Sequence, residues 1–80
     1  MTLAQVRHAE AQLLIPTYDR APVLFERGRG GYLYGADGKR YLDFLGGLAV
    51  NALGHAQAAL RRALADQARR MFHVSNLFYH

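Results

Sequence analysis

The pair Asp37 and Gly38 constrains the fold of this chain more than any other feature, because it separates two short runs rich in tyrosine and leucine, residues 32–34 and 41–44. Such a pair is a strong signal for a β-hairpin, since a type I′ turn needs a positive φ at both central residues. The sequence therefore predicts two antiparallel strands joined by a two-residue turn. The predicted register places Tyr34 opposite Tyr41 and Leu33 opposite Leu42, with Leu33, Leu42 and Phe44 on one face and Tyr32, Tyr34, Tyr41 and Asp43 on the other.

A helix and a further strand are predicted before the hairpin. Thr2 and Gln5 have the spacing of a capping box, so we expect a helix to begin there and to end near residues 14–15, before Pro16. Residues 22–26 read as a strand that begins at its proline, the position in a strand that tolerates proline best. The hairpin and this strand together predict a small three-stranded antiparallel sheet.

The chain after the hairpin is predicted to form a glycine-rich loop and then an amphipathic helix. The loop covers residues 46–55, and its glycines indicate close approach to another part of the structure. The helix is expected over residues 58–72, where apolar side chains recur at helical spacing and need a partner surface, to which the sheet is expected to contribute. The whole sequence thus predicts an α+β fold with an N-terminal helix, a small sheet with a tight hairpin, a glycine-rich loop and one amphipathic helix.

The positive charge of the chain raises the possibility of nucleic-acid binding. The formal net charge is +4, and Arg61, Arg62, Arg69 and Arg70 lie together on the polar face of the second predicted helix. Asp66 can pair with Arg62 and Arg70 at helical spacing, and a charged stripe of this kind is typical of a solvated surface. Basic residues are not expected to be interleaved with the tyrosines on the sheet, which disfavours base stacking there. A small basic nucleic-acid-binding module remains an alternative.

Several common functional motifs are absent. The chain has no cysteine, and its four histidines lack metal-ligand spacing. Leu33 stands where a dinucleotide-binding loop needs its third glycine, and Arg40 stands where a P-loop needs Ser or Thr. No run approaches the ~20 apolar residues of a membrane-spanning helix, and no basic segment with an apolar core opens the chain. We therefore expect a cytoplasmic protein with neither a metal nor a membrane partner.

The order of residues along the chain resembles the opening segment of class III aminotransferases, which have the fold-type I architecture and use pyridoxal phosphate. Within that family the acetylornithine-type enzymes are the most similar. The matching residues are Tyr18, Pro22 and Val23, Glu26 to Gly28, Gly31 to Tyr34, Asp37 and Gly38, Tyr41 to Leu45, Val50 and Asn51, Leu53 to His55, and His73 to Tyr79.

The resemblance implies an enzyme of several hundred residues, of which residues 1–80 are expected to be a truncated N-terminal segment without the catalytic, cofactor-binding domain. It also implies a homodimer that transfers an amino group from N2-acetylornithine to 2-oxoglutarate in arginine biosynthesis. Enzymes acting on 4-aminobutyrate or another ω-amino acid remain alternatives. Such enzymes hold the cofactor on a partly desolvated lysine. The one lysine, Lys39, follows the turn and should be exposed, so we expect no catalytic or cofactor-binding residue and no activity from this chain alone.

Two residues match positions that line the substrate pocket in the family, Tyr18 and Leu48. Leu48 stands where ornithine aminotransferases typically have a tyrosine. A leucine cannot hydrogen-bond a free α-amino group but can pack against a longer or acylated substrate, so the residue resembles that of acetylornithine-type or 4-aminobutyrate-type enzymes. Ordinary core packing is the alternative for both residues. The sequence departs from the family at Gln57 and Ala58, where the family usually has His-Pro, so the start of the second helix loses a favourable first residue.

Overall fold

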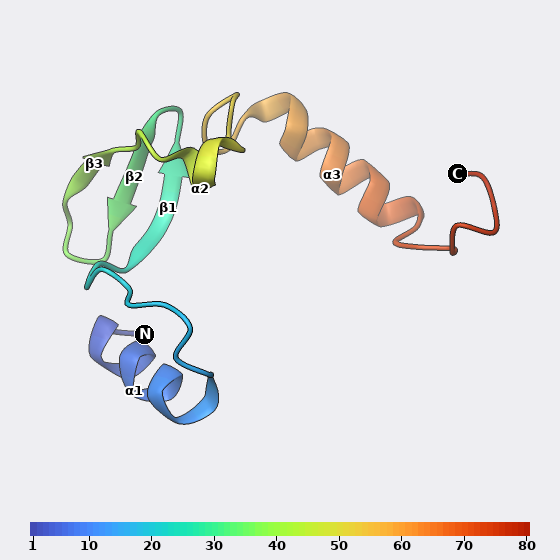
Figure 1. Ribbon diagram of the computed structural model, residues 1–80. Helices are drawn as coiled ribbons and strands as arrows, with labels where there is room; N and C mark the ends of the chain where they lie inside the picture. The colour runs from blue at the N-terminus through green and yellow to red at the C-terminus, as the bar shows by residue number, and fades with distance from the viewer.

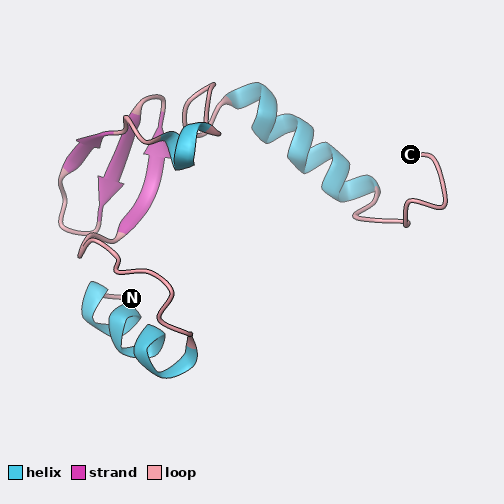
Figure 2. Ribbon diagram, viewed as in Figure 1, coloured by secondary structure: helices cyan, strands magenta, loops and turns pink.

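A computed structural model describes all residues from 1 to 80, and it contains six elements arranged as an extended body (Figure 1). The sheet lies between two helices that project in different directions, with the two termini far apart (Figure 2). The elements in chain order are α1 (Leu3–Leu13), β1 (Phe25–Arg29), β2 (Tyr32–Gly35), β3 (Arg40–Leu42), α2 (Gly46–Ala49) and α3 (Ala58–Arg70). The predicted α+β fold is confirmed, with α2 as an additional short element inside the glycine-rich loop.

Helix α1 begins at the predicted capping box. The backbone N–H of Thr2 donates to Gln5 Oε1 at 2.8 Å, and the backbone N–H of Gln5 donates to Thr2 Oγ1 at 3.2 Å. These two bonds satisfy N–H groups that a helix start leaves without partners. The helix ends at Leu13, and Leu14 is already extended, close to the predicted end before Pro16.

The sheet has the order β1-β2-β3 and is antiparallel throughout. The predicted strand over residues 22–26 is displaced: β1 starts at Phe25 and continues through Gly28 to Arg29. Phe25 pairs with Gly35, the last residue of β2, and the one backbone bond beyond that pair runs from the Ala36 N–H to the Leu24 carbonyl at 2.8 Å. The pairing is irregular between Phe25 and Arg27, which leaves Glu26 as a bulge.

The predicted hairpin exists, but its predicted register is wrong by one residue. Tyr34 pairs with Arg40, and Leu33 pairs with Tyr41. The loop has three residues, because the N–H of Gly35 donates to the Lys39 carbonyl at 3.0 Å and the N–H of Gly38 donates to the Gly35 carbonyl at 3.0 Å. Only Gly38 has a positive φ, +78°, as in a turn that closes with a left-handed bulge residue, whereas a type I′ turn would need one at Asp37 as well.

The side chain of Asp37 explains why the longer loop is favoured. Its Oδ1 accepts from the backbone N–H of Lys39 at 3.0 Å, and its Oδ2 accepts from the Tyr41 hydroxyl at 2.7 Å. The hydroxyl bond is the largest cause that lowers the pKa of Asp37 below its usual value, and the same bond raises the pKa of Tyr41. Because side-chain period in a strand is two, the one-residue shift also exchanges the predicted faces. Leu33 and Tyr41 share one face, and Tyr32, Tyr34 and Leu42 share the other.

The second predicted helix is present as α3, which ends at Arg70 and not at Phe72. Met71 is extended, with a φ of −172°, and its carbonyl accepts from Gln67 Nε2 at 3.0 Å. Asp66 pairs with Arg70 at 2.9 Å, as predicted, but its other partner is Arg69 at 3.4 Å and not Arg62. The expectation that the sheet covers part of the apolar face is wrong, because α3 packs against no other element (Figure 1).

The chain has no hydrophobic core. Gly35 is its one buried residue, and the radius of gyration is 16.6 Å, against roughly 11.6 Å expected for a compact domain of this length. The accessible surface is 7509 Å², whereas a compact protein of 9.0 kDa exposes about 4,900 Å². None of its helices has the length and apolarity needed to cross a bilayer, and no three potential metal-ligating side chains gather in one place.

Candidate functional site

The two ends of the loop between β3 and α3 are joined by the side chains of Asp43 and His55, and we call this junction the neck of the loop. The Asp43 and His55 side chains meet at 2.6 Å between Oδ2 and Nε2. An ionised carboxylate can only accept a hydrogen bond, so the donor is the N–H at His55 Nε2. Asp43 Oδ1 also accepts from the backbone N–H groups of Leu45 at 3.0 Å and Gly46 at 2.9 Å. The two side chains are 8% and 19% exposed, among the best covered of this open chain.

These bonds stabilise the charged form of Asp43. The pKa of Asp43 is lowered, mainly by the Gly46 N–H, next by the His55 side chain and then by the Leu45 N–H, while partial burial opposes the shift. The carboxylate thus acts as a fixed acceptor that joins the end of β3 to the start of the loop and to His55.

Two backbone hydrogen bonds and two glycines hold His55 from the other side. Its N–H donates to the Gly30 carbonyl at 2.7 Å, and the Gly30 N–H donates to the His55 carbonyl at 3.0 Å. A Cβ on Gly28 would lie 2.6 Å from His55 Cγ, and a Cβ on Gly54 would lie 2.8 Å from the Gly30 carbonyl oxygen. The glycine-rich segment does approach another part of the structure closely, and that part is the turn between β1 and β2.

The short element α2 turns in the left-handed sense. The φ angles of Gly46, Gly47, Leu48 and Ala49 are +57°, +64°, +68° and +61°, and the N–H groups of Ala49 and Val50 donate to the carbonyls four residues earlier at 2.9 Å. A left-handed turn costs roughly 1–2 kcal/mol for each residue with a Cβ. Glycine at the first two positions removes half of that cost, and Leu48 and Ala49 retain it. Leu48 projects into solvent, with 78% of its surface exposed.

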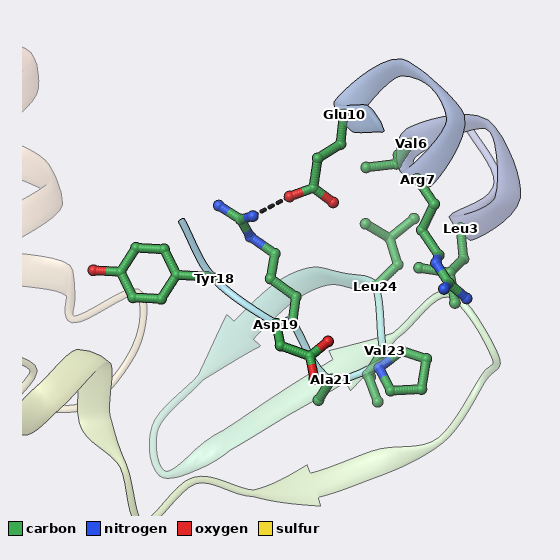
Figure 3. Close-up of a pocket in the computed structure, with 11 residues that line it drawn as sticks. Leu3, Val6, Arg7, Glu10, Tyr18, Asp19, Ala21, Val23 and Leu24 are labelled. Atoms are coloured by element: carbon green, nitrogen blue, oxygen red, sulfur yellow. Dashed lines mark hydrogen bonds and ion pairs between the residues drawn. The ribbon is translucent and has the colours of Figure 1, made fainter. Parts of the chain in front are cut away.

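Tyr18 lies on the extended segment between α1 and β1, beside a small cavity (Figure 3). The cavity holds about 260 Å³ and lies between α1 and residues 18–24, below the volume of most ligand pockets. Glu10 pairs with Arg20 at its edge, and the Tyr18 ring points away from Leu3 and Val6 of α1 (Figure 3). Tyr18 is 75% exposed, and the Arg20 guanidinium lies 5.7 Å from the centroid of its ring.

The two residues predicted to bind substrate are therefore not brought together within this chain. No cavity is lined by both Tyr18 and Leu48. Neither belongs to a packed core here, and their role in a substrate pocket stays a prediction.

Sequence reasoning missed the pair of Asp43 and His55. Twelve residues separate them, and the predicted register placed Asp43 beside the tyrosines. The one available signal was the position of each, an aspartate directly after a strand and a histidine directly after Gly54.

One face of the sheet alternates arginine and tyrosine across the strands, which the linear sequence did not indicate. Tyr34 pairs with Arg27 on one side and Arg40 on the other, and Tyr32 pairs with Arg29. The Arg27 guanidinium lies 3.8 Å from the Tyr34 centroid, and that of Arg40 lies 4.5 Å from the Tyr32 centroid. The statement that basic residues are not interleaved with the tyrosines is wrong in three dimensions, because cross-strand partners supply them.

The only lysine of the chain does not fit the requirements of a pyridoxal phosphate site. Lys39 lies in the hairpin loop, its side chain is 73% exposed, and its Nζ is 4.0 Å from Asp37 Oδ2. A lysine that carries the cofactor needs desolvation, which this position lacks. No step of a cofactor reaction is therefore assigned to residues of this chain.

The arrangement of helix, sheet, loop and helix is found in aminotransferases. The crystal structure of acetylornithine aminotransferase from Elizabethkingia anophelis matches all of the chain with a TM-score of 0.91 and 28% sequence identity, over 21% of that protein. Residues 15–80 match the family described as Aminotransferase class-III. The chain belongs to the class III aminotransferase family, whose members use pyridoxal phosphate, and it corresponds to the N-terminal region of these enzymes.

Two relatives illustrate which class III enzymes are similar. Acetylornithine aminotransferase of Gloeobacter violaceus is 51% identical over 74 residues, which is 92% of this chain and 18% of the relative. Succinylornithine transaminase of Salmonella typhimurium is 47% identical over 76 residues, 95% of this chain and 19% of the relative. The chain thus spans about a fifth of the length of the relatives that it matches.

Proposed function

We propose that this chain is the N-terminal segment of a homodimeric, cytoplasmic aminotransferase that moves an amino group from N2-acetylornithine to 2-oxoglutarate in arginine biosynthesis. The similarity to the Gloeobacter violaceus enzyme, 51% identity over 92% of the chain, carries this proposal. The cofactor site belongs to the remainder of the enzyme, where pyridoxal phosphate would alternate between its aldehyde and amine forms. The chain alone binds no cofactor and catalyses no transfer.

The exposed surface supports a role as part of a larger body. The chain exposes about 2,600 Å² more than a compact protein of its mass, which exceeds three times the roughly 800 Å² that one partner buries in a standard interface. The excess surface is apolar on three elements. These are the end of α1, with Leu13 and the adjoining Leu14, the loop with Phe44, Leu45 and Leu48, and α3 with Leu60 and Leu64. The catalytic remainder and the second subunit would cover them.

The contribution of the segment to specificity is proposed to lie in Leu48 and Tyr18. A leucine offers no hydrogen-bond partner to a free α-amino group. The α-amino group of an unacylated substrate would therefore lie unpaired against Leu48. An acyl chain has apolar surface that can pack there. The Tyr18 hydroxyl is free to contact the polar end of the same substrate.

A chimera tests this function directly. The chain would replace the matching segment of the Gloeobacter violaceus enzyme, and transfer to 2-oxoglutarate would be measured with N2-acetylornithine, N2-succinylornithine, ornithine and 4-aminobutyrate. We expect kcat/KM to be highest for an N2-acylated ornithine. A folded chimera that prefers 4-aminobutyrate would assign the segment to an ω-amino acid enzyme instead.

The interleaved face of the sheet favours one second candidate, a module that binds single-stranded nucleic acid. Arg27, Arg29 and Arg40 could neutralise phosphates beside Tyr32 and Tyr34, and such binding depends steeply on salt. Titration of single-stranded RNA at two salt concentrations distinguishes the candidates. Submicromolar binding at physiological salt that is lost when the three arginines are replaced by glutamine would favour the module.

A further inference from the structure

The loop from residue 44 to residue 54 starts and ends at one place, as in an Ω-loop. Its ends are joined by the 2.6 Å contact between Asp43 and His55, and Asp43 also accepts two backbone N–H groups at the beginning of the loop. The paired backbone bonds between Gly30 and His55 fasten the same neck to the sheet. The neck is therefore the one place where side chains and backbone together fix the loop.

Within the loop, only backbone hydrogen bonds fix the turns: the N–H of Ala49 donates to the Leu45 carbonyl, those of Val50 and Asn51 donate to the Gly46 carbonyl, and that of Gly54 donates to the Asn51 carbonyl, at 2.9–3.0 Å. The large apolar side chains of the loop point outward, and Phe44 is 92% exposed. The left-handed turn places Leu48 and Ala49 in a conformation that residues with a Cβ rarely adopt. A strained backbone persists only where surrounding structure over-determines it. Beyond the backbone bonds of the turn itself, the structure that holds it is the neck, because the Asp43 side chain accepts from the N–H of Gly46, the first residue of the turn.

We propose that Asp43 and His55 are positioning residues for the amino donor. Their hydrogen-bonded pair closes the neck, the closed neck holds the left-handed turn, and the turn presents Leu48 to the acyl group of the substrate. This inference rests on the proposed function. It assigns to the pair no contact with substrate or cofactor, and it makes the preference for an acylated donor depend on residues outside the pocket.

The glycines beside the neck give a way to disturb the pair without changing its charge. A Cβ on Gly28 would overlap the His55 ring, so Gly28→Ala should displace the imidazole while Asp43 and His55 remain. Asp43→Ala removes all three bonds, and Asp43→Asn keeps an acceptor for the Leu45 and Gly46 N–H groups. His55→Gln keeps an N–H donor toward Asp43. Asp66→Asn, on the exposed face of α3, is the matched control.

The experiment uses the chimera and two readouts. In the first, Asp43→Ala and Gly28→Ala should raise KM for N2-acetylornithine about tenfold with kcat changed less than twofold, a size typical of one pocket contact. Asp43→Asn should retain most of the affinity that Asp43→Ala loses, His55→Gln should keep a KM close to that of the unchanged chimera, and Asp66→Asn should change nothing. In the second, hydrogen exchange of the Gly46 and Val50 amides should speed up about tenfold in the same two variants.

The outcomes separate this inference from the proposed function, because exchange is measured without substrate. Faster exchange with unchanged KM would overturn the positioning role while leaving the proposed function intact. An equal fall in kcat for every substrate, without a change in KM, would mean that the pair has only a structural role, and this would also overturn the positioning role. If Asp43→Ala does not fold, Gly28→Ala and Asp43→Asn decide between the same outcomes.

Discussion

Gly54 and Gly38 have the same backbone conformation in very different surroundings, and alanine at the two positions should have unequal effects. Both have a φ of +78°. A Cβ on Gly38 would meet nothing within 4 Å, whereas a Cβ on Gly54 would lie 2.8 Å from the Gly30 oxygen and 3.0 Å from the Gly30 carbon. Gly38→Ala should thus lower the local stability only by the cost of the left-handed conformation, about 1–2 kcal/mol. Gly54→Ala adds a clash with backbone, for a total of about 2–5 kcal/mol.

Native-state hydrogen exchange in the chimera measures these costs locally. The amides to follow are Gly30 and His55 for the neck of the loop and Gly35 for the hairpin. Gly54→Ala should speed exchange at the neck by at least about 30-fold, since 1.36 kcal/mol is a factor of ten. Gly38→Ala should speed exchange at Gly35 by about 5- to 30-fold and leave the neck unchanged. Equal effects at the two sites would refute the close approach of Gly54 to Gly30.

Three further predictions concern specificity, pH and the isolated chain. Leu48→Tyr in the chimera should lower kcat/KM for N2-acetylornithine relative to ornithine by on the order of 1–3 kcal/mol, and an equal loss for both substrates would place Leu48 in ordinary packing. The pKa of Asp43 is lowered in the folded state, so its stabilising contribution should be complete above the ordinary value near 3.8 and disappear as pH falls through the lowered value. Urea unfolding of the chimera and its Asp43→Asn variant should therefore differ at pH 7 and converge in acid; a constant difference would contradict the shift. The isolated 80-residue chain should leave the absorption spectrum of added pyridoxal phosphate unchanged and should transfer no amino group. A new stable band with turnover would contradict the proposal that the chain is one segment of a larger enzyme.

Much of the fold could be predicted from local patterns. The capping box at Thr2, the hairpin around Asp37 and Gly38, and the start of the second helix at Ala58 depend on residues close in sequence. The hairpin register could not be predicted by the same reasoning. An Asp-Gly pair fits both a two-residue and a three-residue loop, and the bonds from Asp37 to Lys39 and Tyr41 decide between them.

The candidate site was less predictable because its contacts are long-range. The pairing of Asp43 with His55 depends on Gly30 and Gly54 meeting across 24 residues, which no periodicity indicates. The alternation of arginine with tyrosine likewise arises from strand pairing, since Arg27 and Arg40 come from strands on either side of Tyr34. A single sequence reports neighbours along the chain far better than neighbours across a sheet.

The most direct test of the central proposal is amino transfer by the chimera that carries this chain in place of the N-terminal segment of the Gloeobacter violaceus acetylornithine aminotransferase. The control is the remainder of that enzyme without any N-terminal segment. We predict that the chimera transfers the amino group of N2-acetylornithine to 2-oxoglutarate with a kcat/KM within roughly 10- to 200-fold of the unmodified enzyme, the range that about 1–3 kcal/mol corresponds to, while the control is inactive. A folded, cofactor-loaded chimera with no more activity than the control would contradict the proposal.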